Sequence, residues 1–142
     1  MSVVVHTLTL RIYYEDTDHG GVVYHANYLK YMERARTEAL REAGIELDVV
    51  DRDAGALFAV TEANLRFRAP ARYSDLLRVE SRLIELQGAR LAFRQSIYRL
   101  ESEGSTLLVE GIVRLACMDR QGRARRIPPS LLPAMRANLS PE

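Results

Sequence analysis

The sequence predicts an α+β domain in which one antiparallel sheet wraps around a single long helix. Three observations carry this prediction. The expected elements follow in the order strand, long helix and four strands, and the later strands alternate apolar and polar side chains. Strands of this kind bury one face and need a cover on it. The amphipathic segment 27–43 is the available cover, so the sheet is expected to curve around it.

The first strand leads into a turn that is dense in reactive groups. One face of the strand carries Val4, His6, Leu8, Leu10, Ile12 and Tyr14. We expect His6 to be a partly buried filler, and we expect the strand to deliver Tyr14 to the edge of the turn. The turn itself contains Asp16, Asp18, His19, the pair Gly20-Gly21 and His25.

The helix after the turn is expected at residues 27–43, because apolar side chains recur there at spacings of three and four. The buried stripe should hold Tyr28, Met32, Ala35, Ala39, Leu40 and Ala43. Gly44 is well placed to end the helix. Residues 46–55 carry four acidic side chains among apolar ones and indicate a connection with room for a helical turn.

Four alternating runs follow the connection. Their expected core faces are Leu57, Ala59, Thr61, Ala63, Leu65 and Phe67; then Leu77, Val79 and Leu83; then Leu91, Phe93 and Ile97; and then Leu107, Val109, Val113, Leu115 and Cys117. Three dipeptides that end in glycine mark strand ends, and the first two predict hairpins: Gln87-Gly88, Glu103-Gly104 and Gln121-Gly122. Residues 128–139 favour a short C-terminal helix, and residues 1–142 are expected to form one domain.

Composition narrows the class of protein. A formal charge of +1 gives no broad basic field, which makes nucleic acid an unexpected partner. One cysteine, Cys117, excludes an intrachain disulfide, and its apolar run predicts a buried inert thiol in a reducing compartment. The chain shows no charged-then-apolar leader and no apolar run long enough for a bilayer. We therefore expect a soluble cytoplasmic protein without stable membrane insertion.

The turn at residues 13–28 concentrates carboxylates, imidazoles and backbone N–H groups in one small volume, as a hydrolytic site requires. Its sequence YYEDTDHGGVVYHANY, followed by YMERARTE at 31–38, resembles the hot-dog-fold thioesterases of the 4-hydroxybenzoyl-CoA thioesterase type. The greatest similarity is to the Tol-Pal-associated acyl-CoA thioesterases. The resemblance implies a hot-dog fold, a five-stranded antiparallel sheet around one central helix. It also implies homodimers or homotetramers that hydrolyse acyl-CoA, or an acyl carrier protein thioester, with no metal or other cofactor.

Position by position, the resemblance places the essential carboxylate of the family on Asp18, its histidine on His25 and its tyrosine on Tyr14. His19 departs from the pattern, because a small residue or proline is expected there. Chemically, Asp18 can attack a thioester carbonyl or deprotonate a water molecule. Backbone N–H groups at the helix start, near His25, are suited to stabilising the oxyanion. Asp16 is expected to hold the turn backbone.

Two other readings of these residues stay open. The first is a transition-metal site built from Asp16, Asp18, His19 and His25. A calcium loop counted from Asp16 fails, because its twelfth position is Asn27. The second is a non-catalytic acyl-CoA or acyl carrier protein scaffold with the same fold. Three arginines near strand ends suit coenzyme A phosphates and suit an ordinary charged rim equally well: Arg68, Arg72 and Arg90.

Overall fold

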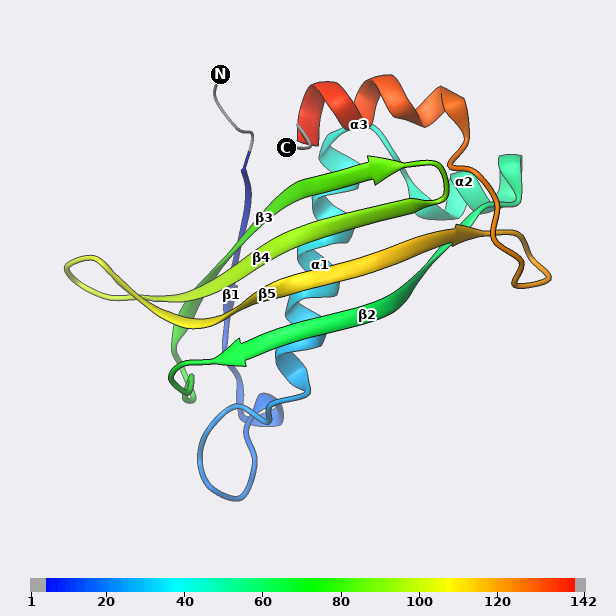
Figure 1. Ribbon diagram of the computed structural model, residues 1–142. Coiled ribbons are helices and arrows are strands. Elements are labelled where there is room, and N and C mark those ends of the chain that lie inside the picture. The colour runs from blue at the N-terminus through cyan, green and yellow to red at the C-terminus, as the bar shows by residue number, and fades with distance from the viewer. Residues whose placement is uncertain (1–4, 140–142) are drawn as a thin grey trace.

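The computed structural model describes residues 5–139, which form a five-stranded antiparallel sheet and its helical cover (Figure 1). The strands are β1 (His6–Arg11), β2 (Leu57–Phe67), β3 (Leu76–Gln87), β4 (Arg90–Leu100) and β5 (Ser105–Met118), in the spatial order β1-β3-β4-β5-β2. The helices are α1 (Asn27–Glu42), α2 (Leu47–Ala54) and α3 (Leu132–Leu139), with short 3₁₀ turns η1 (Tyr14–Asp16) and η2 (Pro129–Leu131).

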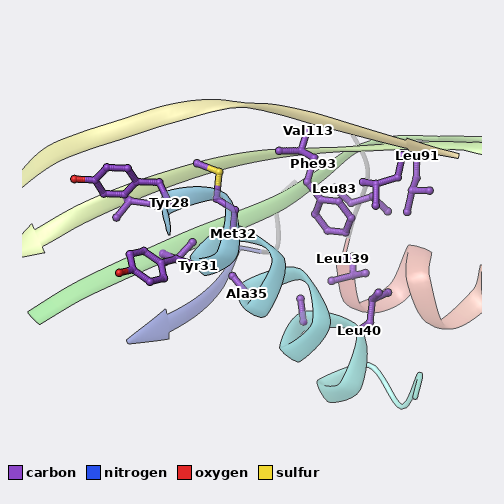
Figure 2. Close-up of a cluster of buried hydrophobic side chains, with 14 of the residues drawn as sticks. Tyr28, Tyr31, Met32, Ala35, Leu40, Leu83, Leu91, Phe93, Val113 and Leu139 are labelled. Atoms are coloured by element: carbon purple, nitrogen blue, oxygen red, sulfur yellow. The ribbon is translucent and has the colours of Figure 1, made fainter. Parts of the chain in front are cut away.

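Helix α1 crosses one face of the curved sheet and supplies the cover that the alternating strands need (Figure 1). The buried side chains of α1 belong to one core with side chains of β3, β4 and β5. Figure 2 labels Met32 of α1, Phe93 of β4 and Val113 of β5 in this core. Met32 is completely buried and Phe93 is nearly so. The predicted α+β hot-dog architecture is therefore confirmed.

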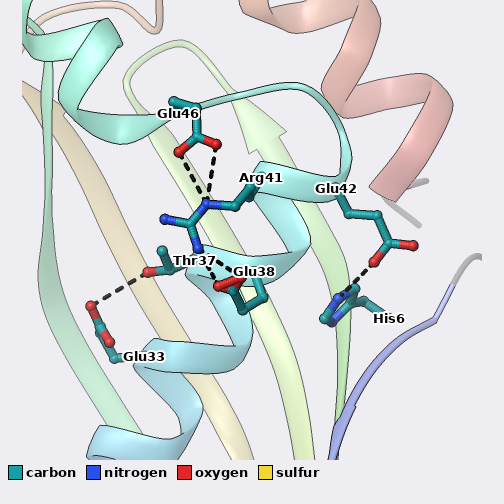
Figure 3. Close-up of polar contacts among 7 residues, drawn as sticks. All are labelled: His6, Glu33, Thr37, Glu38, Arg41, Glu42 and Glu46. Carbon is teal, nitrogen blue, oxygen red and sulfur yellow. Dashed lines mark hydrogen bonds and ion pairs between the residues drawn. The ribbon is translucent and has the colours of Figure 1, made fainter.

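The helix ends where glycine permits it. Gly44 adopts a φ of 86°, and its N–H and that of Ile45 donate to the carbonyls of Arg41 and Leu40. On the outer face Arg41 contacts both Glu38 and Glu46 (Figure 3). These exposed ion pairs contribute little to stability.

His6 is partly buried, as predicted, and its Nε2 lies 3.0 Å from the Glu42 carboxylate at the far end of α1 (Figure 3).

The predicted hairpins between β3 and β4 and between β4 and β5 are confirmed, with antiparallel register on both sides. The connection at 46–55 contains the two-turn helix α2. The predicted strand residue Val4 lies outside the described residues.

Three expectations about strand faces are wrong. Tyr14 is not on the strand face, because β1 ends at Arg11 and the chain turns into η1. Leu107 is only partly buried while Leu108 is fully buried, because a register shift opposite β4 inserts one residue. Phe67 of β2 is 54% exposed, and Thr61 and Ala63 are exposed as well. The cause is that β2 lies at the sheet edge and its register shifts between Val60 and Glu62.

Candidate active site

The first half of the turn is held by Asp16. Its carboxylate accepts a hydrogen bond from the Tyr13 N–H at 2.7 Å, which closes the 3₁₀ turn. Its carbonyl oxygen accepts from the Asn27 side-chain amide at 2.9 Å and from the Tyr24 N–H at 3.0 Å. Asp16 thus joins the turn to the start of α1, which agrees with the structural role expected of it.

Burial of the Tyr31 ring raises the pKa of its hydroxyl, and the neighbouring Asp16 carboxylate adds to that shift. Tyr31 is 1% exposed and comes from the second turn of α1. An anionic Asp16 therefore favours the neutral phenol beside it. The Tyr31 phenol therefore stays neutral over the pH range in which enzymes usually work.

The second half of the turn presents Asp18. Its N–H donates to the Val22 carbonyl at 2.8 Å, and its carbonyl accepts from the Gly21 N–H at 3.0 Å, where Gly21 has a φ of 82°. One carboxylate oxygen, Oδ1, accepts from the Gly20 N–H at 2.9 Å. A Cβ at Gly20 would lie 3.3 Å from the same oxygen, so glycine suits this close approach. The carboxylate is held at one oxygen and is otherwise solvent-exposed.

Asp18 and His25 line one cavity of about 370 Å³. The other lining residues come from the turn, from α1 and from the end of β2 with the loop after it: Val22, Val23, Tyr28, Phe67, Arg68, Ala69 and Pro70. Most of the lining side chains are apolar. The charged one among those just named, Arg68, places its Nε 3.3 Å from the Glu110 carboxylate. Two of the three predicted site residues therefore share one opening.

Tyr28 fixes the wall of this cavity. Its hydroxyl accepts a hydrogen bond from the Ala71 N–H at 3.0 Å, which ties α1 to the loop after β2. Burial raises the pKa of Tyr28, so the phenol stays neutral. The His25 ring lies edge-on to the Phe67 ring, with 6.3 Å between centroids. The imidazole is thereby placed between the turn and the sheet edge.

The helix start supplies unused backbone donors. The N–H groups of Asn27, Tyr28 and Leu29 already donate to the carbonyls of Tyr24, His25 and Ala26, respectively. The N–H groups of His25 and Ala26 donate no hydrogen bond to any described residue. Such donors at a helix N-terminus can stabilise a developing negative charge. The candidate oxyanion donors at the helix start are therefore the N–H groups of His25 and Ala26.

Tyr14 is placed apart from this cavity. It is 74% exposed, it is absent from the cavity lining, and its ring stacks on Tyr73 with 4.0 Å between centroids. His19 is exposed at the tip of the turn and is likewise not part of the lining.

Cys117 is fully buried, and burial raises the pKa of its thiol, in agreement with the expected inert thiol.

The metal reading finds no ligand set in the described part of the chain. Within residues 5–139, no three His, Cys, Asp or Glu side chains gather closely enough to hold a metal ion. In the same residues, no helix has the length and apolar character needed to cross a membrane.

Similarity to known proteins extends over most of the chain. Residues 13–135 match the family model of the thioesterase-like superfamily. The acyl-CoA thioester hydrolase YbgC of Escherichia coli is 37% identical over 133 residues, which cover 93% of this chain and 96% of that protein. A hypothetical protein of Thermus thermophilus of known structure is 38% identical, with a TM-score of 0.85 over 94% of this chain and 98% of that one.

A 4-hydroxybenzoyl-CoA thioesterase crystallised with 4-hydroxybenzoyl-CoA has a TM-score of 0.86, covering 92% of this chain and 97% of that one. At 20% identity, this likeness shows the fold alone. The family match spans the reactive turn, the helix α1, the strands β2 to β5 and the first half of α3. The chain belongs to the thioesterase-like superfamily.

Proposed function

We propose that this protein is an acyl-CoA thioesterase, which hydrolyses the thioester to a free acid and coenzyme A. The observation that carries the proposal is that Asp18 lines one cavity with His25, whose backbone N–H is unused. A carboxylate and an oxyanion donor are the minimum that thioester hydrolysis requires. The Escherichia coli relative, named as an acyl-CoA thioester hydrolase, supports the same activity.

In the proposed mechanism the thioester carbonyl lies between Asp18 and the helix start. The free oxygen of Asp18 either attacks the carbonyl carbon or removes a proton from an attacking water molecule. The first route forms a mixed anhydride, expels the coenzyme A thiolate and is completed by water. In both routes the N–H of His25 stabilises the oxygen that gains charge, and its imidazole steadies the water or substrate. The steps require no metal or cofactor.

Assembly and location are also part of the proposal. We infer a homodimer or homotetramer, because the outer edge of β2 is unpaired in the described chain and carries Val60 and Phe67, which are 50% and 54% exposed. The resemblance to oligomeric thioesterases supports the same assembly. We place the protein in the cytoplasm, where its single free thiol, Cys117, would stay reduced. Light scattering that finds only monomer at micromolar concentration would contradict the assembly.

The activity is tested by release of free thiol from short, long and aromatic acyl-CoAs and from an acylated carrier protein. We expect turnover on at least one acyl-CoA, lost in Asp18→Asn and retained after chelator treatment. Binding of acyl-CoA or acyl carrier protein without any thiol release would instead establish the scaffold reading. Loss of activity in chelator, with recovery on adding one metal, would overturn the metal-free mechanism.

A further inference from the structure

A second cavity lies farther along α1 than the proposed active site. It measures about 530 Å³ and lies between the helix residues from Leu29 to Arg36 and the side chains of Val60, Ala63 and Val113. His25, Leu29, Glu33 and Arg36 follow one another at intervals of four, four and three, so they share one face of the helix. The face that begins at the proposed site therefore continues into this cavity.

Strand β2, at the edge of the sheet, lines the two cavities in the same order. Phe67 of β2 lines the site cavity and lies against the His25 ring, whereas Ala63 and Val60, farther back along β2, line the second cavity. Figure 1 shows β2 reaching its carboxyl end near the start of α1. Moving away from the turn, helix and strand thus line first one cavity and then the other. A chain attached at the thioester would leave the site along this mainly apolar groove.

The groove contains a buried cation with little compensation. Arg36 is only 7% exposed, and its hydrogen bond within residues 5–139 is a single one, from Nη1 to the Gln95 side-chain oxygen at 3.0 Å. No carboxylate of these residues forms an ion pair with it. Burial lowers the pKa of Arg36, and the charge of Glu33 opposes that shift only in part. Buried charges are ordinarily paired, and a guanidinium has several donors to satisfy.

The Gln95 side chain fixes the position of Arg36. Gln95 is completely buried in β4, and its amide nitrogen donates to the Met32 carbonyl at 2.9 Å and to the Ser81 hydroxyl at 2.8 Å. Its oxygen is therefore oriented toward Arg36 by two further hydrogen bonds. The guanidinium is held by a rigid part of the core, and Arg36 is also one of the residues that line the groove. This is the arrangement expected of a preorganised binding group.

We propose that Arg36 binds an oxygen at the far end of the acyl group, so that the preferred substrates are acyl-CoAs with an ω-carboxylate or ω-hydroxyl rather than a plain methyl end. The inference rests on the proposed thioesterase function. A carboxylate is the better match, because it supplies the missing counter-charge and can accept two hydrogen bonds from one guanidinium.

The geometry also sets the length of the acyl group. Arg36 is 11 residues after His25, about 16 Å along a helix that rises about 1.5 Å per residue. Side chains on a helix lean toward its N-terminus, which shortens the distance that the ligand must span. With carbon–carbon bonds of about 1.5 Å in a zigzag chain, the fit is to acyl groups on the order of eight to twelve carbons.

The test compares decanoyl-CoA with its ω-carboxy analogue sebacoyl-CoA and with 10-hydroxydecanoyl-CoA. We expect kcat/KM to be highest for sebacoyl-CoA. In Arg36→Met, which keeps an unbranched side chain but removes the charge, the ratio of sebacoyl to decanoyl turnover should fall by about tenfold to a hundredfold. Arg36→Lys keeps the cation without the planar fork and should retain part of the preference. Arg41→Met, on the exposed face of the same helix, is the matched control and should leave the ratio unchanged.

Binding is measured separately by calorimetry on Asp18→Asn, with the same three thioesters. Tighter binding of sebacoyl-CoA supports the inference even if no thioester is hydrolysed, so failure of the proposed function remains distinguishable. Equal binding and turnover of the three compounds by the unmodified protein would overturn the inference, and would mean that Arg36 is purely structural or meets an acid of a second copy. If only 10-hydroxydecanoyl-CoA is preferred, Arg36 recognises a neutral oxygen and the carboxylate match is wrong. Should Arg36→Met fail to fold, Arg36→Lys and the unmodified protein still decide the question.

Discussion

The two halves of the reactive turn use the same side chain in opposite ways. Asp16 directs its carboxylate to the Tyr13 N–H and its carbonyl to two further donors, so it is bound into the backbone. Asp18, two residues later, has one oxygen held by the Gly20 N–H and lines a cavity with His25. Chemical identity therefore does not decide which aspartate is available for reaction. The local hydrogen bonding decides it, and this difference can be tested on each side of the turn.

The largest effect is expected at Asp18. Asn keeps the size and the hydrogen bond to Gly20 but removes the negative charge, so neither direct attack nor proton abstraction survives. We expect Asp18→Asn to lower kcat by at least roughly a hundredfold, the scale of losing a general base. Because Asp18 is exposed, the free energy of unfolding should change by no more than about 0.5 kcal/mol. Steady-state thiol release and thermal melting measure the two quantities.

Asp16→Asn is the paired control, since it makes the same chemical change on the other half of the turn. Turnover should fall far less than in Asp18→Asn. If a folded Asp16→Asn protein is inactive while Asp18→Asn is active, the catalytic aspartate is Asp16 and not Asp18. Full activity of both variants would refute a carboxylate mechanism altogether.

The next effect separates the imidazole of His25 from its backbone. His25→Ala removes the ring but keeps the N–H donor, so we expect kcat to fall by about tenfold, less than for Asp18→Asn. Ala26→Pro removes the other unused N–H at a residue whose φ of −67° suits proline. Ala26 does not line the cavity, and this variant should stay within about threefold of the unmodified rate. A hundredfold loss in folded Ala26→Pro would move the oxyanion donor from His25 to Ala26.

A stability effect is expected where the turn is held. Asp16→Ala leaves the Tyr13 N–H without its acceptor, as in the loss of a helix cap, and should lower the free energy of unfolding by about 1 to 2 kcal/mol. The corresponding fall in melting temperature is roughly 3 to 6 °C. Differential scanning calorimetry gives both values. An unchanged melting temperature would show that the Asp16 carboxylate does not support the turn.

The sequence predicted the elements well because periodicity reports which face of a segment is buried. The α1 stripe and the core faces of β3 and β4 follow directly from it. Position in the sheet is a tertiary property, and the alternation of β2 contains no sign that β2 lies at an edge with Phe67 exposed. The register shifts in β2 and β5 were missed for the same reason, since they depend on the partner strand.

The buried polar pair was also missed, although a signal was present. Arg36 follows Met32 by four residues, so a charged side chain falls on the apolar stripe of α1. Gln95 lies between Phe93 and Ile97 on the apolar face of β4. Two polar residues at core positions of elements that pack together indicate a buried hydrogen bond. The motif at residues 13–28 led to Asp18 and His25, but it does not say which tyrosine reaches the cavity.

The smallest effect is expected at Tyr14. The resemblance assigns it a catalytic role, which stays a prediction, whereas the geometry favours packing: its ring stacks on Tyr73 and lies outside the cavity lining. Tyr14→Phe keeps the stacked ring and removes only the hydroxyl, so kcat should remain within about twofold if the hydroxyl takes no part. Tyr73→Phe makes the same change on the other ring of the stack and is the matched control. A tenfold loss of kcat confined to Tyr14→Phe, with an unchanged melting temperature, would place the Tyr14 hydroxyl in the reaction. The catalytic part of the turn would then include a residue before Asp16.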